Sequence, residues 1–422
     1  MFKKHLTHKN MRSIINIGDV MEREILHVDV NNAFLSWTAI YLLEHGYKED
    51  IRKIPSIIGG DEKERKGIVI AKSPVAKKFG IVTAEPIFQA KKKCPDLQVF
   101  PANHEWYKIE SKKFKDYLKQ YSPNIEEFSI DECFVDMTGT NYLYKDYLEL
   151  AYTIKNEIKE RFGFTVNVGV ANNKLCAKMA SDFEKPDKVH TLFKEEIVTK
   201  LWPLDVKNLF MVGKKTTQEL YKMNIHTIGE LAHTDYKQLV KQFKEQQADY
   251  LRKSSWGIDN SEVNESNYHK NSSISTTETL PHDISDEEKL KEYLLLHTEK
   301  VTRELREKEK YACTVAVICK DRYFKTYTAQ EKLSNPTNDT KEIYKRVVEI
   351  FEKNFKKDPL RLIGVRLTDL CDKKNEQLSI FEIENKKDNI SNIQKTIDEL
   401  NRKFGSDLII SASLKVIAQH KD

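Results

Sequence analysis

Three carboxylates on two expected strands, Asp29, Asp131 and Glu132, constrain the fold of this chain more than any other feature. The run 25–30 is typical of a buried strand and carries Asp29, and the run 125–135, which alternates loosely between apolar and polar residues, carries Asp131 and Glu132. A carboxylate on an apolar strand is costly to bury unless a partner compensates its charge. Three of them on two strands indicate one shared partner, a divalent cation held by hard oxygen ligands. Carboxylates and a cation without a nucleophilic side chain favour phosphoryl transfer.

The adjacent pair Asp131-Glu132 has two interpretations of equal weight when it is taken alone. It can begin a turn, or it can bind two Mg²⁺ ions, with one carboxylate bridging both ions and the other bound to a single ion. Two such ions, about 4 Å apart, hold a 3′-hydroxyl and a triphosphate. Asp29 favours the second interpretation, because it supplies a third ligand of the same kind from a separate strand.

Charge and cysteine content limit the classes of protein to which this chain can belong. Its 422 residues suggest roughly two to four domains. The 70 Lys and Arg against 65 Asp and Glu leave a net charge of +5, which by itself does not require a nucleic-acid partner. The six cysteines form no CxxC pair, so we expect reduced thiols in a cytoplasmic protein rather than a zinc site. No apolar run reaches about 18 residues, so we expect no membrane span.

The order of periodic segments predicts two α+β units separated by a helical region and a linker. The first unit has expected strands at 25–30, 53–58, 67–71, 125–135 and 165–171, and expected helices at 33–45, 73–79, 107–121, 147–162 and 174–182. A helical pattern follows up to about residue 256, and the Asn- and Ser-rich stretch 260–273 is typical of a linker. The second unit has expected strands at 273–280, 312–319, 324–329 and 362–370, and expected helices at 286–308 and 340–354.

Three motifs carry a specific resemblance to a known family. They are Val28-Asp29-Val30-Asn31-Asn32-Ala33-Phe34, Ser129-Ile130-Asp131-Glu132 and Val168-Gly169-Val170-Ala171-Asn172-Asn173-Lys174-Leu175-Cys176-Ala177-Lys178. In order and spacing, over some 350 residues, they closely resemble the Y-family (translesion) DNA polymerases. The resemblance implies a right-hand polymerase with an N-terminal extension (1–23), a palm (24–32 and 102–190), small fingers (33–101), a helical thumb (191–260), a linker (261–272), a little finger (273–372) and a tail (373–422).

The same resemblance assigns the chemistry of the site. It implies that Asp29, Asp131 and Glu132 are catalytic and that they bind two Mg²⁺ ions together with the Val30 carbonyl. Asn32, Ala33 and Phe34 are then expected beside the incoming nucleotide. Phe34 falls at the position of the steric gate, where an aromatic ring excludes the 2′-hydroxyl of a ribonucleotide. Without the neighbouring motif, Phe34 would be interpreted as a core aromatic on a helix face.

Lysines are the expected ligands of the triphosphate, because a compact ammonium on a flexible stem suits a phosphate. Lys178 lies in the third motif, and Lys77 lies on the expected helix at 73–79. Many family members carry a Thr, a Tyr and an Arg along that helix, whereas this chain has Ala71, Pro74 and Lys77. We therefore expect Ser73 to replace one of the missing hydroxyl contacts.

Two regions are expected to contact DNA. Gly213, Lys214, Lys215 and Thr216 lie in a sequence that resembles a helix-hairpin-helix, in which backbone N–H groups at a helix N-terminus approach a phosphate. In the little-finger region, four basic residues are candidates for phosphate contacts across the template groove, namely Arg322, Lys325, Arg361 and Arg366. Ordinary helix packing and solvated surface charge are the alternatives for the two regions.

The tail contains a short apolar peptide among charged residues, formed by Gln377, Leu378, Ile380 and Phe381 around Ser379. It resembles the sliding-clamp-binding motif of bacterial polymerases, and such a tether raises the effective concentration of an enzyme at a primer end. The tail and Asn31 favour the UmuC-type branch of the family over the DNA polymerase IV branch.

These inferences predict a monomeric, template-directed, low-fidelity DNA polymerase that adds deoxynucleotides to a primer 3′-end in translesion synthesis and DNA repair. Low fidelity is expected because the fingers segment is short and Ala33 leaves a roomy site. Two alternatives stand beside this prediction: a palm-fold nucleotide cyclase, and a catalytically silent, clamp-associated DNA-binding protein. The helix-hairpin-helix and the clamp-like peptide argue against the first, and the three acidic residues argue against the second.

Overall fold

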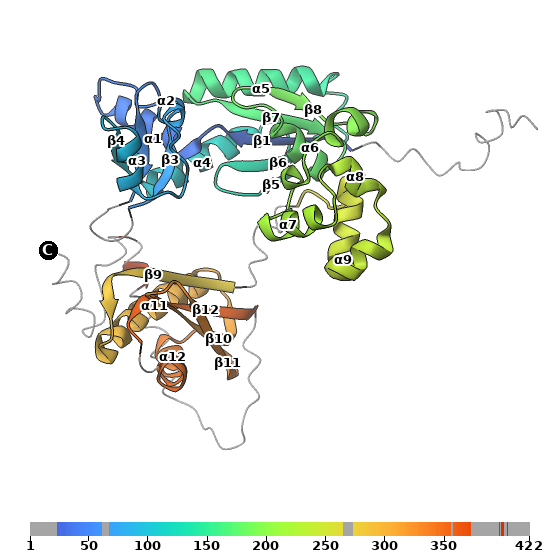
Figure 1. The fold of residues 1–422 in the computed structure, drawn as a ribbon. Helices are drawn as coiled ribbons and strands as arrows, with labels where there is room; N and C mark the ends of the chain where they lie inside the picture. Colours follow the sequence, from blue (N-terminus) through green and yellow to red (C-terminus); the bar gives the residue numbers. More distant parts are fainter. Residues whose placement is uncertain are drawn as a thin grey trace, which may run out of the picture. The chain divides into compact units, whose positions relative to one another are not determined.

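The computed structural model describes residues 23–60, 67–264, 273–355 and 358–372, together with 396, 398–400 and 403. The chain forms two compact units (Figure 1), one made of Met1–Ile58, Ile70–Thr83 and Ala90–His269, the other of Gly59–Val69, Ala84–Gln89 and Lys270–Asp422. The predicted N-terminal extension up to residue 22 and the clamp-like peptide lie outside the described residues. Within the described residues, no helix is long and apolar enough to span a membrane.

The first unit is built on a five-stranded sheet with the order β5-β6-β1-β7-β8. Its strands are β5 (Ile125–Glu127), β6 (Glu132–Asp136), β1 (Ile25–Val30), β7 (Val166–Ala171) and β8 (Val189–Thr191). The central strand β1 is buried at every position and pairs antiparallel with both β6 and β7. The sequence predicted one strand over 125–135, but a turn at 128–131 divides it into β5 and β6.

Helices cover both faces of this sheet. Leu26, Val28 and Val30 pack with α4 (His104–Leu118) and α5 (Tyr147–Phe162), whereas Ile25 packs with α6 (Lys174–Ser181). Figure 1 shows α5 and α6 on opposite sides of the strands. Because side chains alternate along a strand, Asp29 lies on the same face as Ile25, the face that α6 covers.

Gly169 on β7 allows α6 to lie directly on the sheet. A Cβ atom at this position would lie 1.9 Å from the carbonyl oxygen of Ala177 and 2.6 Å from the backbone nitrogen of Ser181. No side chain fits in that space, since real Cβ atoms are not found so close to backbone atoms. The glycine therefore fixes the distance between α6 and the strands that carry the acidic residues.

A smaller sheet follows α1 (Ala33–Glu44) and has the order β3-β2-β4, with β2 (Ser56–Gly59), β3 (Val69–Lys72) and β4 (Gln98–Pro101). Two short helices accompany it, α2 (Pro74–Lys78) and α3 (Ile87–Lys93). Ser73 caps α2 and Pro74 occupies its first turn. After β8 the chain is mainly helical, with α7 (Lys214–Lys222), α8 (Ile228–His233) and α9 (Tyr236–Ser255).

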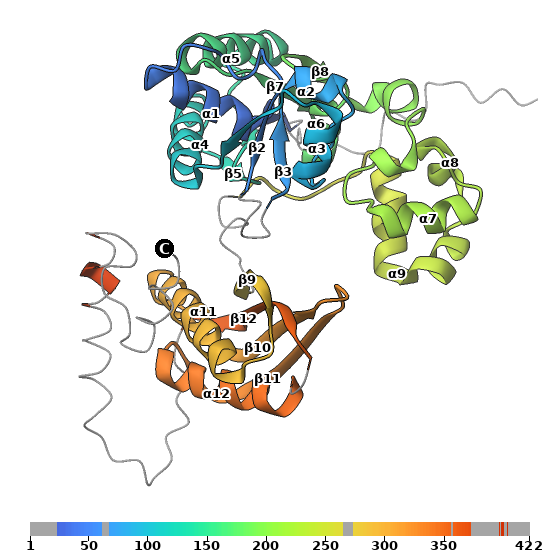
Figure 2. The ribbon, with the colours of Figure 1, turned by 60° about the vertical axis from the view of Figure 1, so that its left-hand side comes forward.

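The second unit is an antiparallel sheet with the order β11-β10-β12-β9, covered on one face by α11 and α12 (Figure 2). The elements are β9 (Ser273–Ile284), α11 (Glu287–Glu307), β10 (Tyr311–Asp321), β11 (Thr326–Thr337), α12 (Thr340–Asn354) and β12 (Leu360–Cys371). Asp286 and Asp339 cap the two helices through their side chains. The predicted order of strands and helices in this unit is confirmed, although β9 and β11 are longer than the sequence suggested.

Candidate active site

Asp29 and Glu132 face one another across neighbouring strands. The β1–β6 pairing places Asp29 opposite Glu132, and the β1–β7 pairing places it opposite Asn167. Directly paired residues of an antiparallel ladder point to the same face with their Cβ atoms about 5 Å apart. Asp29 is only 4% exposed, so its charge depends on the groups that the fold provides.

Two lysines provide the countercharge. Lys178 on α6 places its Nζ atom 2.7 Å from Glu132 Oε1 and 3.3 Å from Asp29 Oδ2. Lys185, which follows α6, places its Nζ atom 2.8 Å from Asp29 Oδ2. Asp182 joins the two ammonium groups, at 3.1 Å from Lys178 and 2.9 Å from Lys185. The prediction of Lys178 as a site residue therefore has a geometric basis, and Lys185 and Asp182 are additional members.

The protonation equilibria reflect this crowding. Burial raises the pKa of Glu132 to about 7, and the hydrogen bond to Asp29 and the charge of Asp29 act in the same direction. Burial opposes ionisation of Asp29 as well, but the hydrogen bond from Glu132 and the two lysines outweigh it and lower the pKa of Asp29. Burial disfavours the charge of Lys178, yet attraction to Asp29 and Glu132 raises its pKa. Burial and the nearby charge of Asp29 therefore both disfavour the ionised form of Glu132.

Asp131 lies in the turn before β6 rather than on a strand. Its backbone carbonyl accepts a hydrogen bond from Val30 N at 3.0 Å, and its carboxylate accepts one from Ser129 Oγ at 2.6 Å. The turn thus joins Asp131 to the end of β1, one residue beyond Asp29. A turn at Asp131-Glu132 was one of the two interpretations of the sequence, and the structure has Asp131 in a turn directly before Glu132 begins β6.

The carboxylates of Asp29, Asp131 and Glu132 have the chemistry that a hard divalent cation requires. Their oxygen atoms do not, however, converge on one point. Within the described residues, no group of three or more His, Cys, Asp and Glu side chains is placed to hold a metal ion. Asp29 and Glu132 converge on Lys178, whereas the carboxylate of Asp131 bonds Ser129. All the donors are oxygen atoms, which magnesium prefers, and a cation bound by Asp29 and Glu132 would reduce the repulsion between them.

Phe34 projects from the first turn of α1. Its ring stacks on Tyr107 with a centroid distance of 4.8 Å and an interplanar angle of 22°, and the edge of His104 lies 6.1 Å away. Asn32 adopts a left-handed conformation (φ 50°) and donates from Nδ2 to the Lys72 carbonyl at 2.8 Å. Ala33 begins α1 and is buried. Asn32 thus ends β1 and starts α1, which brings Phe34 within five residues of Asp29.

The hydroxyl group of Ser73 makes all of its hydrogen bonds within the protein and has none left for a nucleotide. It is fully buried, donates from Oγ to the Ile54 carbonyl at 2.7 Å and accepts hydrogen bonds from the backbone N–H groups of Ala76 and Ser56. Its role is to cap α2, and the expectation that it contacts the triphosphate is corrected accordingly. Lys77 is exposed on the same helix and stays a candidate.

The predicted DNA-contacting turn begins α7. Gly213 is its N-cap residue without a side-chain cap, and no atom lies within 4 Å of a Cβ built on it. Lys214 and Lys215 are exposed, whereas Thr216 accepts a hydrogen bond from Gln247 Nε2 at 3.0 Å. An uncapped, exposed helix N-terminus with adjacent lysines matches a phosphate-binding turn.

The four basic candidates of the second unit form two groups. Arg322 and Lys325 lie at the β10–β11 turn and Arg361 lies on β12. They cover Tyr323, Tyr327 and Phe324, in that order, at 5.3, 4.9 and 4.6 Å. Arg366 lies on β12 between Val365 and Leu367, whose side chains pack under the helices. Arg366 therefore points to the face of the sheet opposite to α11 and α12.

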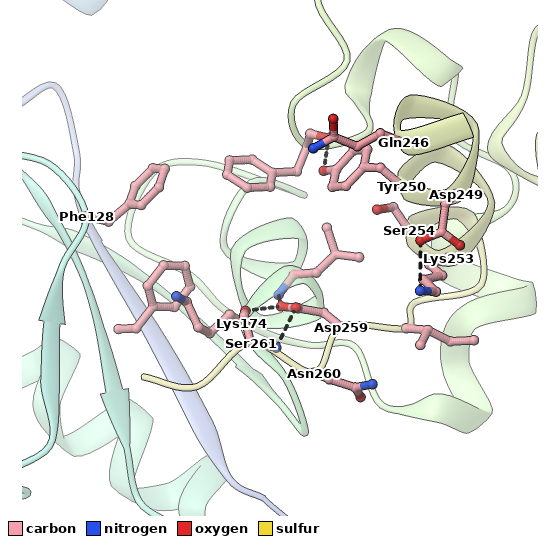
Figure 3. A pocket seen from close by; sticks show the side chains of 14 residues that line it. Phe128, Lys174, Gln246, Asp249, Tyr250, Lys253, Ser254, Asp259, Asn260 and Ser261 are labelled. Atoms are coloured by element: carbon pink, nitrogen blue, oxygen red, sulfur yellow. Dashed lines mark hydrogen bonds and ion pairs between the residues drawn. The ribbon is translucent and has the colours of Figure 1, made fainter. Parts of the chain in front are cut away.

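A cavity of about 490 Å³ lies between the five-stranded sheet and α9 (Figure 3). Phe128 and Phe134 line it from the sheet, and Phe210 and Tyr250 line it from the helical region. Tyr250 donates its hydroxyl to the Phe210 carbonyl at 2.7 Å. No sequence pattern pointed to this cavity, because its aromatic residues are scattered over more than a hundred positions.

The residues that sequence reasoning missed lie close to those that it found. Lys185 and Asp182 follow Lys178 within seven residues, and the lysine spacing was the available signal. Tyr107 and His104 carried no such signal, because only the packing of α4 against α1 brings them to Phe34.

Comparisons with known proteins find two family regions in the chain. The impB/mucB/samB family model matches residues 28–182, and the model of the impB/mucB/samB family C-terminal domain matches residues 271–380. The DNA polymerase IV of Clostridium acetobutylicum is 43% identical over 396 residues, which cover 93% of this chain and 98% of that protein. The DNA polymerase IV 1 of Bacillus subtilis is 35% identical over 390 residues, which cover 92% of each protein.

Among solved structures, the Y-family DNA polymerase chimera Dbh-Dpo4(243-245)-Dbh matches with a TM-score of 0.73 and 23% sequence identity. The match covers 83% of this chain and 100% of the chimera. At this identity the likeness concerns the fold, and it confirms the predicted α+β architecture.

Proposed function

Because the chain belongs to the impB/mucB/samB family of Y-family DNA polymerases, we propose how its residues carry out the template-directed extension of a primer. The chain is a DNA-directed DNA polymerase of the translesion class, which binds primer-template DNA and deoxynucleoside triphosphates. Its relatives are DNA polymerases IV, so the preference for the UmuC-type branch drawn from Asn31 and the tail was wrong. A cyclase or a silent scaffold is not favoured, since the similarity spans nearly the whole length of these polymerases.

In this proposal Asp29, Asp131, Glu132 and the Val30 carbonyl hold two Mg²⁺ ions. When bound, the ions lower the pKa of the primer 3′-hydroxyl and neutralise charge on the triphosphate. The fold supports this assignment because the paired strands fix Asp29 beside Glu132, and the Val30–Asp131 hydrogen bond fixes the third acidic residue to the same strand end. Preorganised backbone of this kind keeps the ligands in place during the reaction.

The lysines are proposed to bind the triphosphate. Lys178 and Lys185 already lie within 3.3 Å of carboxylate oxygens, on the face of the sheet that carries Asp29 and Glu132. Asp182 keeps their two ammonium groups side by side. Lys77 on α2 is the third proposed contact, reaching from the side of the smaller sheet. The lysines orient the phosphates and balance their charge without taking part in bond making.

Sugar and DNA contacts complete the proposal. Phe34, supported by Tyr107, closes the space beneath the sugar and rejects a 2′-hydroxyl, with Asn32 and Ala33 beside it. The turn from Gly213 to Thr216 binds a phosphate through backbone N–H groups, and the basic residues of the second unit bind further phosphates. The protein acts as a monomer, and the peptide from Gln377 to Phe381 binds a sliding clamp.

The observation that carries the proposal is the pairing of Asp29 with Glu132 under Lys178. Primer extension with Mg²⁺ tests it, using Asp29→Asn, Glu132→Gln and the double change Asp131→Asn with Glu132→Gln. We expect each single change to lower the rate roughly 10³-fold, because it removes a ligand at the reacting centre. Asp136→Asn is the matched control, since it lies on β6 and its remaining amide oxygen still accepts from Thr138 N. Extension that survives the double change would refute the proposed mechanism.

A further inference from the structure

Residues 257–264, which follow α9, run across the N-terminal turn of α6, and we refer to them as the strap. The strap begins very close to the helix: Gly257 has φ 67°, and a Cβ here would lie 2.5 Å from Ile197 Cδ1 and 3.2 Å from Cys176 Sγ. Its next residues, Ile258 to Ser261, line the cavity of Figure 3 on the side of Lys174 and Leu175. The strap therefore lies against α6.

Polar contacts tie the strap to three consecutive positions of the first turn. Asn173 donates from Nδ2 to the Gly257 carbonyl at 2.9 Å, and Leu175 donates its backbone N–H to Asp259 Oδ2 at 3.1 Å. Glu126 on β5 holds both Lys174 Nζ, at 2.6 Å, and the backbone N–H of Asn264, at 3.0 Å. The strap is thus fixed near both of its ends.

Asp259 is the central tie. Its carboxylate accepts from Leu175 N and also from the backbone N–H and the hydroxyl of Ser261, at 2.9 and 3.0 Å. Figure 3 shows Asp259 beside Ser261, with dashed lines marking the hydrogen bonds between them. A carboxylate at a helix N-terminus satisfies an N–H group that the helix itself leaves unpaired. Asp259 does this for α6 from more than eighty residues away in the sequence.

The position of α6 matters because Lys178 lies one turn after Leu175, about 4.5 Å along the helix axis. α6 cannot move closer to the sheet, because Gly169 is already in contact with Ala177 and Ser181. The sheet does not prevent the first turn of α6 from moving away from it, and the strap opposes that movement.

We propose that Asp259 is a positioning residue of the polymerase, which holds the first turn of α6 and thereby places Lys178 for the incoming nucleotide. The inference rests on the proposed role of Lys178 at the triphosphate. It adds a residue outside the three sequence motifs to the machinery of nucleotide binding, and it gives the segment between α9 and the linker a role in the active site.

The test compares Asp259→Ala with Asp259→Asn, whose amide oxygen can still accept from Leu175 N. For Asp259→Ala we expect the KM for the incoming deoxynucleotide to rise about tenfold, with kcat and the Kd for primer-template DNA within about twofold of the parent. For Asp259→Asn we expect a KM close to that of the parent protein. The matched control is Asp249→Ala, because Asp249 lines the same cavity but bonds only the exposed Lys253 among the described residues. Hydrogen exchange at the Leu175 amide, measured on the same proteins without nucleotide, should quicken only in Asp259→Ala.

The outcomes separate the possibilities. Faster exchange at Leu175 with an unchanged KM would overturn the proposal and leave Asp259 a merely structural cap. A rise in the Kd for DNA without a rise in KM would also overturn it. If Asp259→Ala does not fold, Asp259→Glu, which displaces the oxygen by one methylene, should reproduce the rise in KM. Failure of the parent protein to extend a primer would instead refute the proposed function, while the exchange result would still report on the strap.

Discussion

Lys178 and Glu132 form the shortest ion pair at the site, at 2.7 Å, and Lys178 is also 3.3 Å from Asp29. One ammonium group thus serves two carboxylates that face each other across β1 and β6. Removing one partner from a buried ionic group leaves the others uncompensated, which costs more than the pair itself contributes.

Lys178→Met should therefore destabilise the first unit even without substrate. We expect a loss of about 3 kcal/mol in the free energy of unfolding, because Asp29 and Glu132 would repel each other with Lys185 alone opposing them. Urea denaturation followed by circular dichroism measures this loss. Lys108→Met is the control, since Lys108 forms an exposed pair with Glu105, and a similar loss in both variants would contradict the prediction.

Gly169→Ala should displace α6. A new Cβ would meet the Ala177 carbonyl at 1.9 Å, and overpacking against backbone costs about 3 kcal/mol or more because neither side can move freely. Thermal unfolding and primer extension should both suffer. Gly213→Ala provides the matched control for stability, since nothing lies within 4 Å of its Cβ, and its melting temperature should equal that of the parent.

Phe34→Ala should weaken sugar selection. The ring stacks on Tyr107 at 4.8 Å and so has a fixed place, and its removal opens room for a 2′-hydroxyl. We expect ribonucleotide incorporation, relative to deoxynucleotide incorporation, to rise roughly 100-fold in single-nucleotide assays. Phe79→Ala, which removes an exposed ring at the end of α2, should leave the ratio unchanged. Equal ratios in all three proteins would refute the gate.

The second unit should lose stability in acid because of His297. Burial lowers the pKa of His297 to about 4, Glu278 opposes this shift and Lys300 reinforces it. An unfolded histidine binds a proton below about pH 6.5, whereas folded His297 does so only near pH 4, so unfolding takes up a proton in between. The free energy of unfolding should fall by roughly 3 kcal/mol from pH 7 to pH 4 through this group. His297→Leu should flatten that part of the urea-derived pH profile, while His282→Leu, at an exposed position, should not. A parent profile without this fall would contradict the prediction.

The apolar run Ile25–Val30 was sufficient to predict a buried strand that carries Asp29. The motif around Lys178 predicted a helix that follows a strand, and the structure has α6 directly after β7. These features are local, because a repeat of two or of 3.6 residues can be recognised from neighbouring positions in the sequence.

What the sequence could not show depends on contacts between distant segments. Ser73 has the residue type of a nucleotide ligand, but Ile54 and Ser56 use its hydroxyl. Asp131 belongs to a turn because Val30 pairs with its carbonyl. Asp259 contacts Leu175 only because α9 brings the chain back to α6, and no local repeat in the sequence indicates this contact. Tertiary contacts of this kind override local pattern.

The two groups of basic residues in the second unit predict different salt dependences of DNA binding. A contact to a phosphate releases counterions, so each one lost should reduce the slope of log K against log salt by about 0.9. Arg366 lies on the sheet face away from α11 and α12, as do Lys320 and Lys332, whereas Arg361 lies on β12 and covers the Phe324 ring of the β10–β11 turn at 4.6 Å. Arg366→Ala should therefore remove one contact. The double change Arg322→Ala with Lys325→Ala should remove up to two phosphate contacts. Arg361 should keep its own contact, because it packs on the Phe324 ring and not on the two substituted residues. Fluorescence anisotropy of a primer-template over a salt series measures the slopes. Lys345→Ala, on the helical side of this unit, is the control, and slopes that match the control in both variants would exclude these residues from the DNA interface.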